Sequence, residues 1–99
     1  MMQKNYHGDD DQTIELHGDD TLTVHSHLFR KKTFAIKDIS TLCFDEGKLL
    51  LNMIPVRNGR ILITTTEGGM HQVFFSRRNR DAFRALYLFL CQKTGQPVK

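Results

Sequence analysis

Apolar and polar residues alternate along two stretches near the C-terminus, 60–66 and 70–75. This period of two is typical of strands with one buried face, and the first stretch is rich in the β-branched residues that a pleated sheet favours. The Glu-Gly-Gly segment 67–69 between them supplies residues that tolerate positive φ, as a tight turn requires. The pattern therefore predicts a hairpin.

The register of this hairpin follows from its faces. With a three-residue loop, Ile61 pairs with Phe75. Ile63 then pairs with Val73, and one face becomes apolar, whereas a two-residue loop mixes polar and apolar side chains. We therefore predict the three-residue loop. Two large apolar side chains then share the other face and need a cover: Leu62 and Phe74.

The hairpin leads into a predicted amphipathic helix over 77–93. Ser76 can accept a backbone N–H as the N-cap, with Asn79 as the alternative, and Gly95 follows the last turn. Four residues at helical spacing form its apolar stripe: Phe83, Leu86, Tyr87 and Leu90. This stripe requires a sheet beneath it.

A second hairpin is predicted near the N-terminus, with strands over 13–17 and 21–27 on either side of the Gly-Asp-Asp turn 18–20. Its register places four aliphatic residues on one face, in the pairs Leu16–Leu22 and Ile14–Val24. The hairpin therefore presents one apolar and one polar face, and the apolar face needs a core to cover.

Two histidines on the polar face, His25 and His27, have a His-x-His spacing that puts both rings on one side of a strand. A metal site needs a third ligand, and Glu15, diagonal to His25, is the available candidate. We expect surface histidines rather than a metal centre. Because no catalytic triad, phosphate-loop, Cys-x-x-Cys or His-Glu-x-x-His pattern occurs, we also expect no catalysis and no cofactor.

The middle of the chain predicts short strands over 33–36 and 39–44, joined by a bend at 37–38. Residues 48–56 are apolar without a clear period. They are best interpreted as a strand broken by its proline, which places it at a sheet edge, either in the core or paired with another copy of the chain. The Asn-Gly pair at 58–59 predicts a further hairpin turn.

The 99 residues are expected to form one domain over 13–93, preceded by a flexible acidic arm at 1–12 and followed by a disordered tail at 94–99. Because no run of about 18 apolar residues and no signal-peptide core occurs, we expect a cytoplasmic protein without a transmembrane segment. Cys43 and Cys91 lie in apolar contexts and are expected to be buried, reduced thiols.

The net charge of +3 is unevenly distributed. Residues 1–20 carry six acidic groups against one lysine, whereas residues 21–99 carry 13 basic and five acidic groups. Two basic clusters form a candidate anion-binding site: Arg30, Lys31 and Lys32 in a turn, and Arg77, Arg78 and Arg80 at the start of the helix. A solvated basic surface without a ligand is the alternative interpretation.

The segment 28–39, LFRKKTFAIKDI, resembles the bacterial pleckstrin-homology-like (PH-like) domains, in which a basic turn and a short strand precede an Asp-Ile pair. The final hairpin and helix are similar to those of the same family, so the resemblance spans residues 13–93. It implies a mainly β (α+β) fold: a PH-like barrel of two near-orthogonal antiparallel sheets, six to seven strands in all, capped by one C-terminal α-helix.

The resemblance also implies a scaffold that binds peptides, lipid headgroups or further copies of itself. Its phosphoinositide-binding members place basic residues in the first hairpin loop, which is acidic here at 18–20. We therefore predict a non-catalytic interaction module that binds protein partners or self-associates, with an acidic lipid headgroup or nucleic acid as the alternative ligand. The candidate interface consists of the surplus apolar positions Leu49, Leu51, Met53, Leu62 and Phe74.

Overall fold

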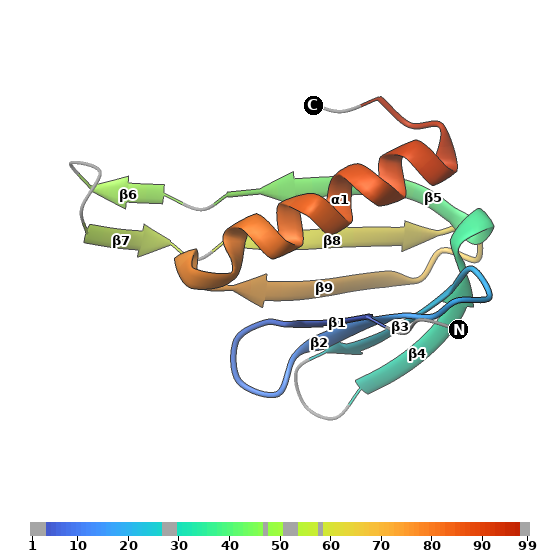
Figure 1. The fold of residues 1–99 in the computed structure, drawn as a ribbon, viewed down its shortest axis with the longest axis horizontal. Coiled ribbons are helices and arrows are strands. Elements are labelled where there is room, and N and C mark those ends of the chain that lie inside the picture. The colour runs from blue at the N-terminus through green and yellow to red at the C-terminus, as the bar shows by residue number, and fades with distance from the viewer. Residues whose placement is uncertain (1–3, 27–29, 47, 51–53, 58, 98–99) are drawn as a thin grey trace.

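A computed structural model of the chain describes residues 4–26, 30–46, 48–50, 54–57 and 59–97. These residues form nine strands in three antiparallel sheets, two short 3-10 turns (η1 and η2) and one C-terminal α-helix (Figure 1). The elements are β1 (Lys4–His7), β2 (Thr13–Leu16), β3 (Thr21–Ser26), β4 (Arg30–Ala35), η1 (Ile36–Asp38), β5 (Ile39–Asp45), β6 (Lys48–Leu50), β7 (Ile54–Arg57), β8 (Gly59–Thr65), β9 (Met70–Phe75), η2 (Arg77–Asn79) and α1 (Arg80–Thr94). No helix among the described residues is long and apolar enough to span a membrane.

The first sheet has four strands in the order β1-β2-β3-β4. Its central hairpin has the predicted register, in which Ile14 pairs with Val24 and Leu16 with Leu22. Ile14, Leu22 and Val24 are buried and Leu16 is half-buried. The apolar face predicted from the period of two is therefore confirmed.

Strand β1 corrects the predicted flexible arm. It pairs with β2, with Tyr6 opposite Ile14, and Tyr6 is only 5% exposed. Its ring lies 6.1 Å from that of Phe83 on α1, centroid to centroid. Tyr6 is the only apolar residue in β1, so the strand forms because β2 offers an edge and the core accepts one aromatic ring.

The second sheet has three strands in the order β5-β8-β9. The chain enters it through η1, which lies where the sequence predicts a bend, so β4 and β5 belong to different sheets. Residues 48–56 form two strands rather than the predicted single one: β6 and β7 make a separate two-stranded sheet, and in the described part of the chain β7 pairs with β6 alone, so Pro55 lies in an edge strand as predicted. Asn58 of the predicted Asn-Gly turn lies outside the described residues, and among those residues β8 pairs with β5 and β9 rather than with β7.

The β8–β9 hairpin has a three-residue loop, as predicted, but its register differs by two residues. Ile61 pairs with Val73, and Thr65 N–H donates to Gly69 O at 2.9 Å, so the loop is 66–68 rather than 67–69. Gly68 has φ +89°, and the last residue of such a loop takes this left-handed conformation. The predicted faces survive because a shift of two residues preserves side-chain direction.

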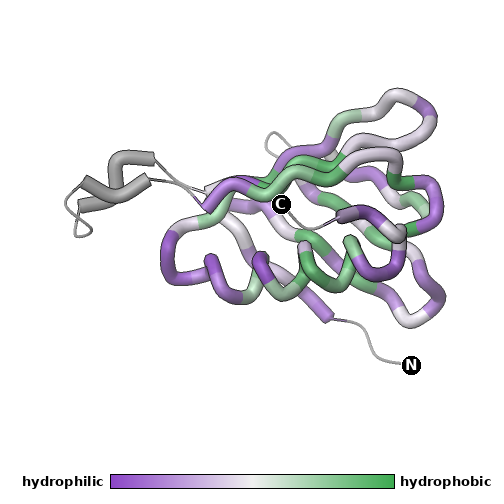
Figure 2. The backbone as a smooth tube through the Cα atoms, turned by 90° about the horizontal axis from the view of Figure 1, so that it is seen from above, coloured by the Kyte–Doolittle hydropathy of each residue, from purple (hydrophilic) through white to green (hydrophobic). Residues whose placement is uncertain are grey.

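Helix α1 lies across one face of the three-stranded sheet and packs against η1, β5 and β8 (Figure 1). The four stripe residues are all buried, as the helical period predicts: Phe83, Leu86, Tyr87 and Leu90. The ring of Phe83 stacks on that of Phe75, with centroids 4.7 Å apart. Hydrophobic segments run along the strands and the helix, and hydrophilic residues gather at the turns (Figure 2).

The two ends of the helix differ in how well they are predicted. Gly95 adopts φ +72° and its N–H bonds Cys91 O, which confirms the C-terminal stop. Ser76 and Asn79 occupy the N-cap positions of η2 and α1, as predicted, but neither makes the predicted side-chain capping bond. Turn η2 replaces the side-chain capping bonds with a backbone bond: Asn79 N–H, just before α1, donates to Ser76 O at 2.9 Å.

Two smaller corrections concern the cysteines and the tail. Cys91 is buried at 2% exposure, as predicted, but Cys43 is exposed because it pairs with Leu62 on the face of the sheet away from the core. In the predicted tail, Thr94 still belongs to α1, and Gln96 donates from Nε2 to Ser40 O at 3.2 Å. The mainly β fold with two main antiparallel sheets and a C-terminal helix is confirmed, but the predicted six to seven strands are wrong: the described residues form nine, because β1 and the separate β6–β7 pair add to the two sheets.

Candidate functional site

Strand β9 forms one edge of its sheet, since it pairs with β8 alone in the described part of the chain. The β1–β2 loop closes this edge at one residue, Phe74. Asp9 N–H donates to Phe74 O at 2.8 Å, and Phe74 N–H donates to the side-chain oxygen of Gln12 at 2.9 Å. Both backbone groups of Phe74 therefore point away from β8.

The neighbouring backbone groups follow from strand geometry. In an antiparallel pair, the residues whose N–H and C=O face the partner strand alternate with those whose groups face outward. Because Phe74 faces outward, Gln72 and Met70 do so as well, and no backbone bond on that side is found for either among the described residues. From Met70 to Gln72, β9 is an open strand edge.

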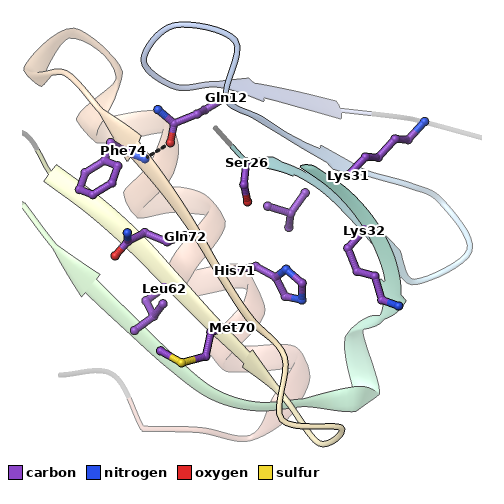
Figure 3. Close-up of a pocket in the computed structure, with 10 residues that line it drawn as sticks. Gln12, Ser26, Lys31, Lys32, Leu62, Met70, His71, Gln72 and Phe74 are labelled. Carbon is purple, nitrogen blue, oxygen red and sulfur yellow. Dashed lines mark hydrogen bonds between the residues drawn. The ribbon is translucent and has the colours of Figure 1, made fainter. Parts of the chain in front are cut away.

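A groove of about 510 Å³ lies along this open edge, between β9 and the β3–β4 pair (Figure 3). Its volume falls within the range of about 300–1,000 Å³ that is typical of ligand sites. The lining residues come from four strands and one loop: Gln12, Val24, Ser26, Lys31, Lys32, Leu62, Met70, His71, Gln72 and Phe74.

The two faces of β9 give the groove an apolar and a polar side. Leu62 and Phe74 are half-buried on the outer face, beside Met70, which is 68% exposed. On the opposite face, His71 projects toward β4, where Lys32 lies (Figure 3). The predicted placement of Leu62 and Phe74 on one outer face is therefore confirmed, although Leu62 pairs with Gln72 rather than with Phe74, and their cover is only partial.

The ring of His71 stacks on Phe34 of β4, with centroids 5.1 Å apart and an interplanar angle of 21°. Burial, and secondarily the charge of Lys32, lower the pKa of His71, so its imidazole is predominantly neutral at pH 7. Lys32 and Lys31 are exposed, and neither has an ion-pair partner among the described residues. The polar side therefore presents an unneutralised positive charge.

The six predicted anion-binding residues do not form one site. The predicted turn at 30–32 is wrong, since these residues begin strand β4 and pair with β3. Lys31 and Lys32 line the groove, whereas the side chain of Arg30 is not among those described. The three arginines lie at the start of the helix: Arg77 and Arg78 are exposed on η2, and Arg80 pairs with Asp81 at 3.5 Å. None of the three lines the groove.

The histidine face carries a linked polar network rather than a metal-ligand set. His25 Nε2 lies 2.8 Å from a carboxylate oxygen of Glu15, which confirms their predicted proximity. His17 Nε2 lies 3.9 Å from the other Glu15 oxygen and 2.9 Å from Thr23 Oγ1. In the described part of the chain, no three His, Cys, Asp or Glu side chains are placed to hold a metal ion, and His27 lies outside that part.

Part of the predicted apolar interface lies outside the described residues, namely Leu51 and Met53. Leu49 is in β6, but its side chain is not described. Sequence reasoning missed the groove residues Gln12, Ser26, Met70, His71 and Gln72. Only the hairpin register could have indicated the last three, since it defines which residues of β9 turn their backbone groups away from β8.

Comparisons with protein-family models, curated proteins and solved structures find no match to this chain.

Proposed function

We propose that the chain is a non-catalytic protein-binding module that adds an extended segment of a partner protein to the open edge of β9. In strand addition, backbone hydrogen bonds supply affinity and pockets for alternate side chains supply specificity. The observation that supports this function is the pair of outward-facing residues, Gln72 and Met70, beside a groove with apolar and polar sides.

The fold class that we infer is the PH-like one. The resemblance implies two antiparallel sheets followed by a C-terminal helix, and the sheets of four and three strands with helix α1 after them support this inference; the β6–β7 hairpin is an addition to it. Because a fold of this kind does not determine its ligand, the functional proposal depends on the groove rather than on the class.

Because the edge of β9 is closed at Phe74, it suits a short bound segment of a partner better than a further long strand of the same sheet. Open strand edges are aggregation hazards, and proteins commonly cover or interrupt them. Here the β1–β2 loop covers one end of β9 and leaves the stretch from Met70 to Gln72 open. A strand rises about 3.3 Å per residue, so this stretch of about three residues is short. A short open edge suits a short bound segment.

The test uses Gln72→Pro with Gln72→Ala as its matched control. Proline removes only an outward N–H, so the β8–β9 ladder keeps its bonds, while the pyrrolidine ring blocks the docking edge. Both variants lose the 3.0 Å bond from Arg60 Nη1 to the Gln72 side chain. Thermal unfolding of both variants verifies that they fold.

Random peptides displayed on phage are selected on the immobilised full chain, and enriched peptides are then measured against the two variants. We expect them to bind wild type and Gln72→Ala alike and to lose at least about tenfold in affinity for Gln72→Pro, since the bond from the Gln72 N–H, about 0.5–1.5 kcal/mol, is lost and the proline ring also clashes with the docked segment. Equal binding to Gln72→Pro, or no enrichment at all, contradicts strand addition.

Self-association through the same edge is the second candidate, and it is favoured by the 68% exposure of Met70. A second copy can dock its own β9 against the first, which would make the interface isologous. Sedimentation velocity over a wide concentration range distinguishes the two cases. A dimer that Gln72→Pro dissociates and Gln72→Ala preserves supports self-association, whereas a monomer at every concentration leaves a partner protein as the ligand.

A further inference from the structure

We propose that the segment bound along β9 is acidic, and that one of its carboxylates lies between Lys32 and His71 on the β4 side of the groove. This inference rests on the proposed strand addition and adds the chemistry of the partner: an extended acidic peptide segment. It is argued from the direction of the added side chains, from the charges that they meet and from the lack of an internal partner for Lys32.

The direction of the added side chains follows from strand pairing. Side chains of paired residues project from the same face of a sheet, and successive residues alternate between faces. A residue placed opposite Gln72 therefore projects on the face of Leu62 and Phe74, where an apolar side chain gains cover. A residue placed opposite His71 projects toward β4.

The side of the groove toward β4 carries Lys32. Lys32 pairs with Val24, which is 1% exposed, so both project from the core-facing side of the first sheet. Its neighbour Lys31 pairs with His25 and projects from the opposite side, and its side chain extends away from His71 (Figure 3). Only Lys32 is therefore directed to meet a side chain of the added strand.

Lys32 and His71 together offer a carboxylate a charge and a hydrogen bond. Lys32 has no ion-pair partner among the described residues, and neither nitrogen of the His71 ring has a hydrogen bond there. A neutral imidazole retains one N–H donor, and its stacking on Phe34 holds the ring at the groove. A carboxylate between them satisfies the lysine and the histidine at once.

The opposite end of the groove repels an acidic residue. There the β1–β2 loop, which closes the edge at Phe74, carries Asp9, Asp10 and Asp11. The two ends of the groove therefore differ in charge: the Phe74 end is negative and the Lys32 end is positive. A single carboxylate in the bound segment is favoured at one end only, which defines the register of the segment.

The experiment measures fluorescence polarisation of two short capped peptides on the full chain. One alternates valine with threonine and carries a single glutamate opposite His71, and the other has glutamine in that place. We expect the glutamate peptide to bind about three- to fivefold more tightly to wild type, as befits a partly exposed charge pair. This preference should disappear in Lys32→Gln and decrease at high salt.

Lys31→Gln is the matched control, because it removes the same charge from the adjacent residue on the other side of β4. Retention of the preference in Lys31→Gln and its loss in Lys32→Gln support the inference. If both peptides bind wild type equally and Gln72→Pro binds neither, the acidic partner is wrong and strand addition stands. If Gln72→Pro binds both as wild type does, or wild type binds neither, strand addition itself is wrong.

Discussion

Replacement of Gln12 by alanine tests how the two sheets are joined beside the groove. Gln12 is 5% exposed, accepts from Phe74 N–H at 2.9 Å and donates from Nε2 to Asp9 O at 3.1 Å. Alanine removes both bonds. Asp9 O keeps its bond from Gln12 N–H at 3.0 Å, so the main consequence is a donor left unsatisfied on β9.

The magnitude follows from these two losses. An unsatisfied buried donor costs about 1–3 kcal/mol, and the second bond contributes about 0.5–1.5 kcal/mol. Because Phe74 is half-buried, water can reach the vacated space, and we expect a total near the lower end, about 2 kcal/mol. For a chain of this size the change corresponds to a fall in Tm of about 8–16 °C.

The assay is equilibrium unfolding in urea, with Gln96→Ala as the control. Gln96 also donates from its side chain to a backbone carbonyl, Ser40 O at 3.2 Å, but this bond is exposed. We expect the control to lose less than about 0.5 kcal/mol, with unchanged m-values for both variants. If Gln12→Ala is no less stable than Gln96→Ala, the Gln12 side chain does not fasten the loop to β9.

Three further predictions concern the core, the loop and pH. Phe83→Ala empties a fully buried ring position and should lower the unfolding free energy by about 3–5 kcal/mol in urea titrations. Gly8→Ala brings a Cβ against the backbone oxygen of Phe74, so we expect a loss of about 1–3 kcal/mol by the same method. The lowered pKa of His71, caused by burial and by Lys32, means that the unfolded chain takes up this proton first on acidification. Stability should therefore fall as pH drops below about 6.5, and less steeply in His71→Gln; identical slopes would contradict this.

Much of the strand arrangement could be predicted because periodicity and turn chemistry agree. The pairs Ile14–Val24 and Leu16–Leu22 follow from the requirement that one face be apolar, and the helical stripe follows in the same way. The register of the last hairpin could not be derived, since two registers that differ by two residues have identical faces. The left-handed conformation of Gly68 distinguishes them, and the sequence offers two adjacent glycines for that position.

The groove itself could not be predicted, for two physical reasons. Its defining feature is backbone direction on β9, which depends on register and on which strand lies at the edge. Its side chains come from segments far apart in the chain, among them Gln12, which the sequence places in a flexible arm. Strand β1 was unpredictable for a related reason, since Tyr6 supplies its only apolar side chain and its pairing with β2 supplies the rest.

Backbone amide hydrogen exchange, followed by NMR on the unliganded chain, tests the open edge of β9 most directly. Val73 N–H faces β8 and Phe74 N–H bonds Gln12, so both should be protected from exchange. Gln72 N–H, between His71 and Val73, should exchange far faster than either neighbour. Protection of Gln72 equal to that of Val73 would contradict the open edge, and with it the proposed strand addition.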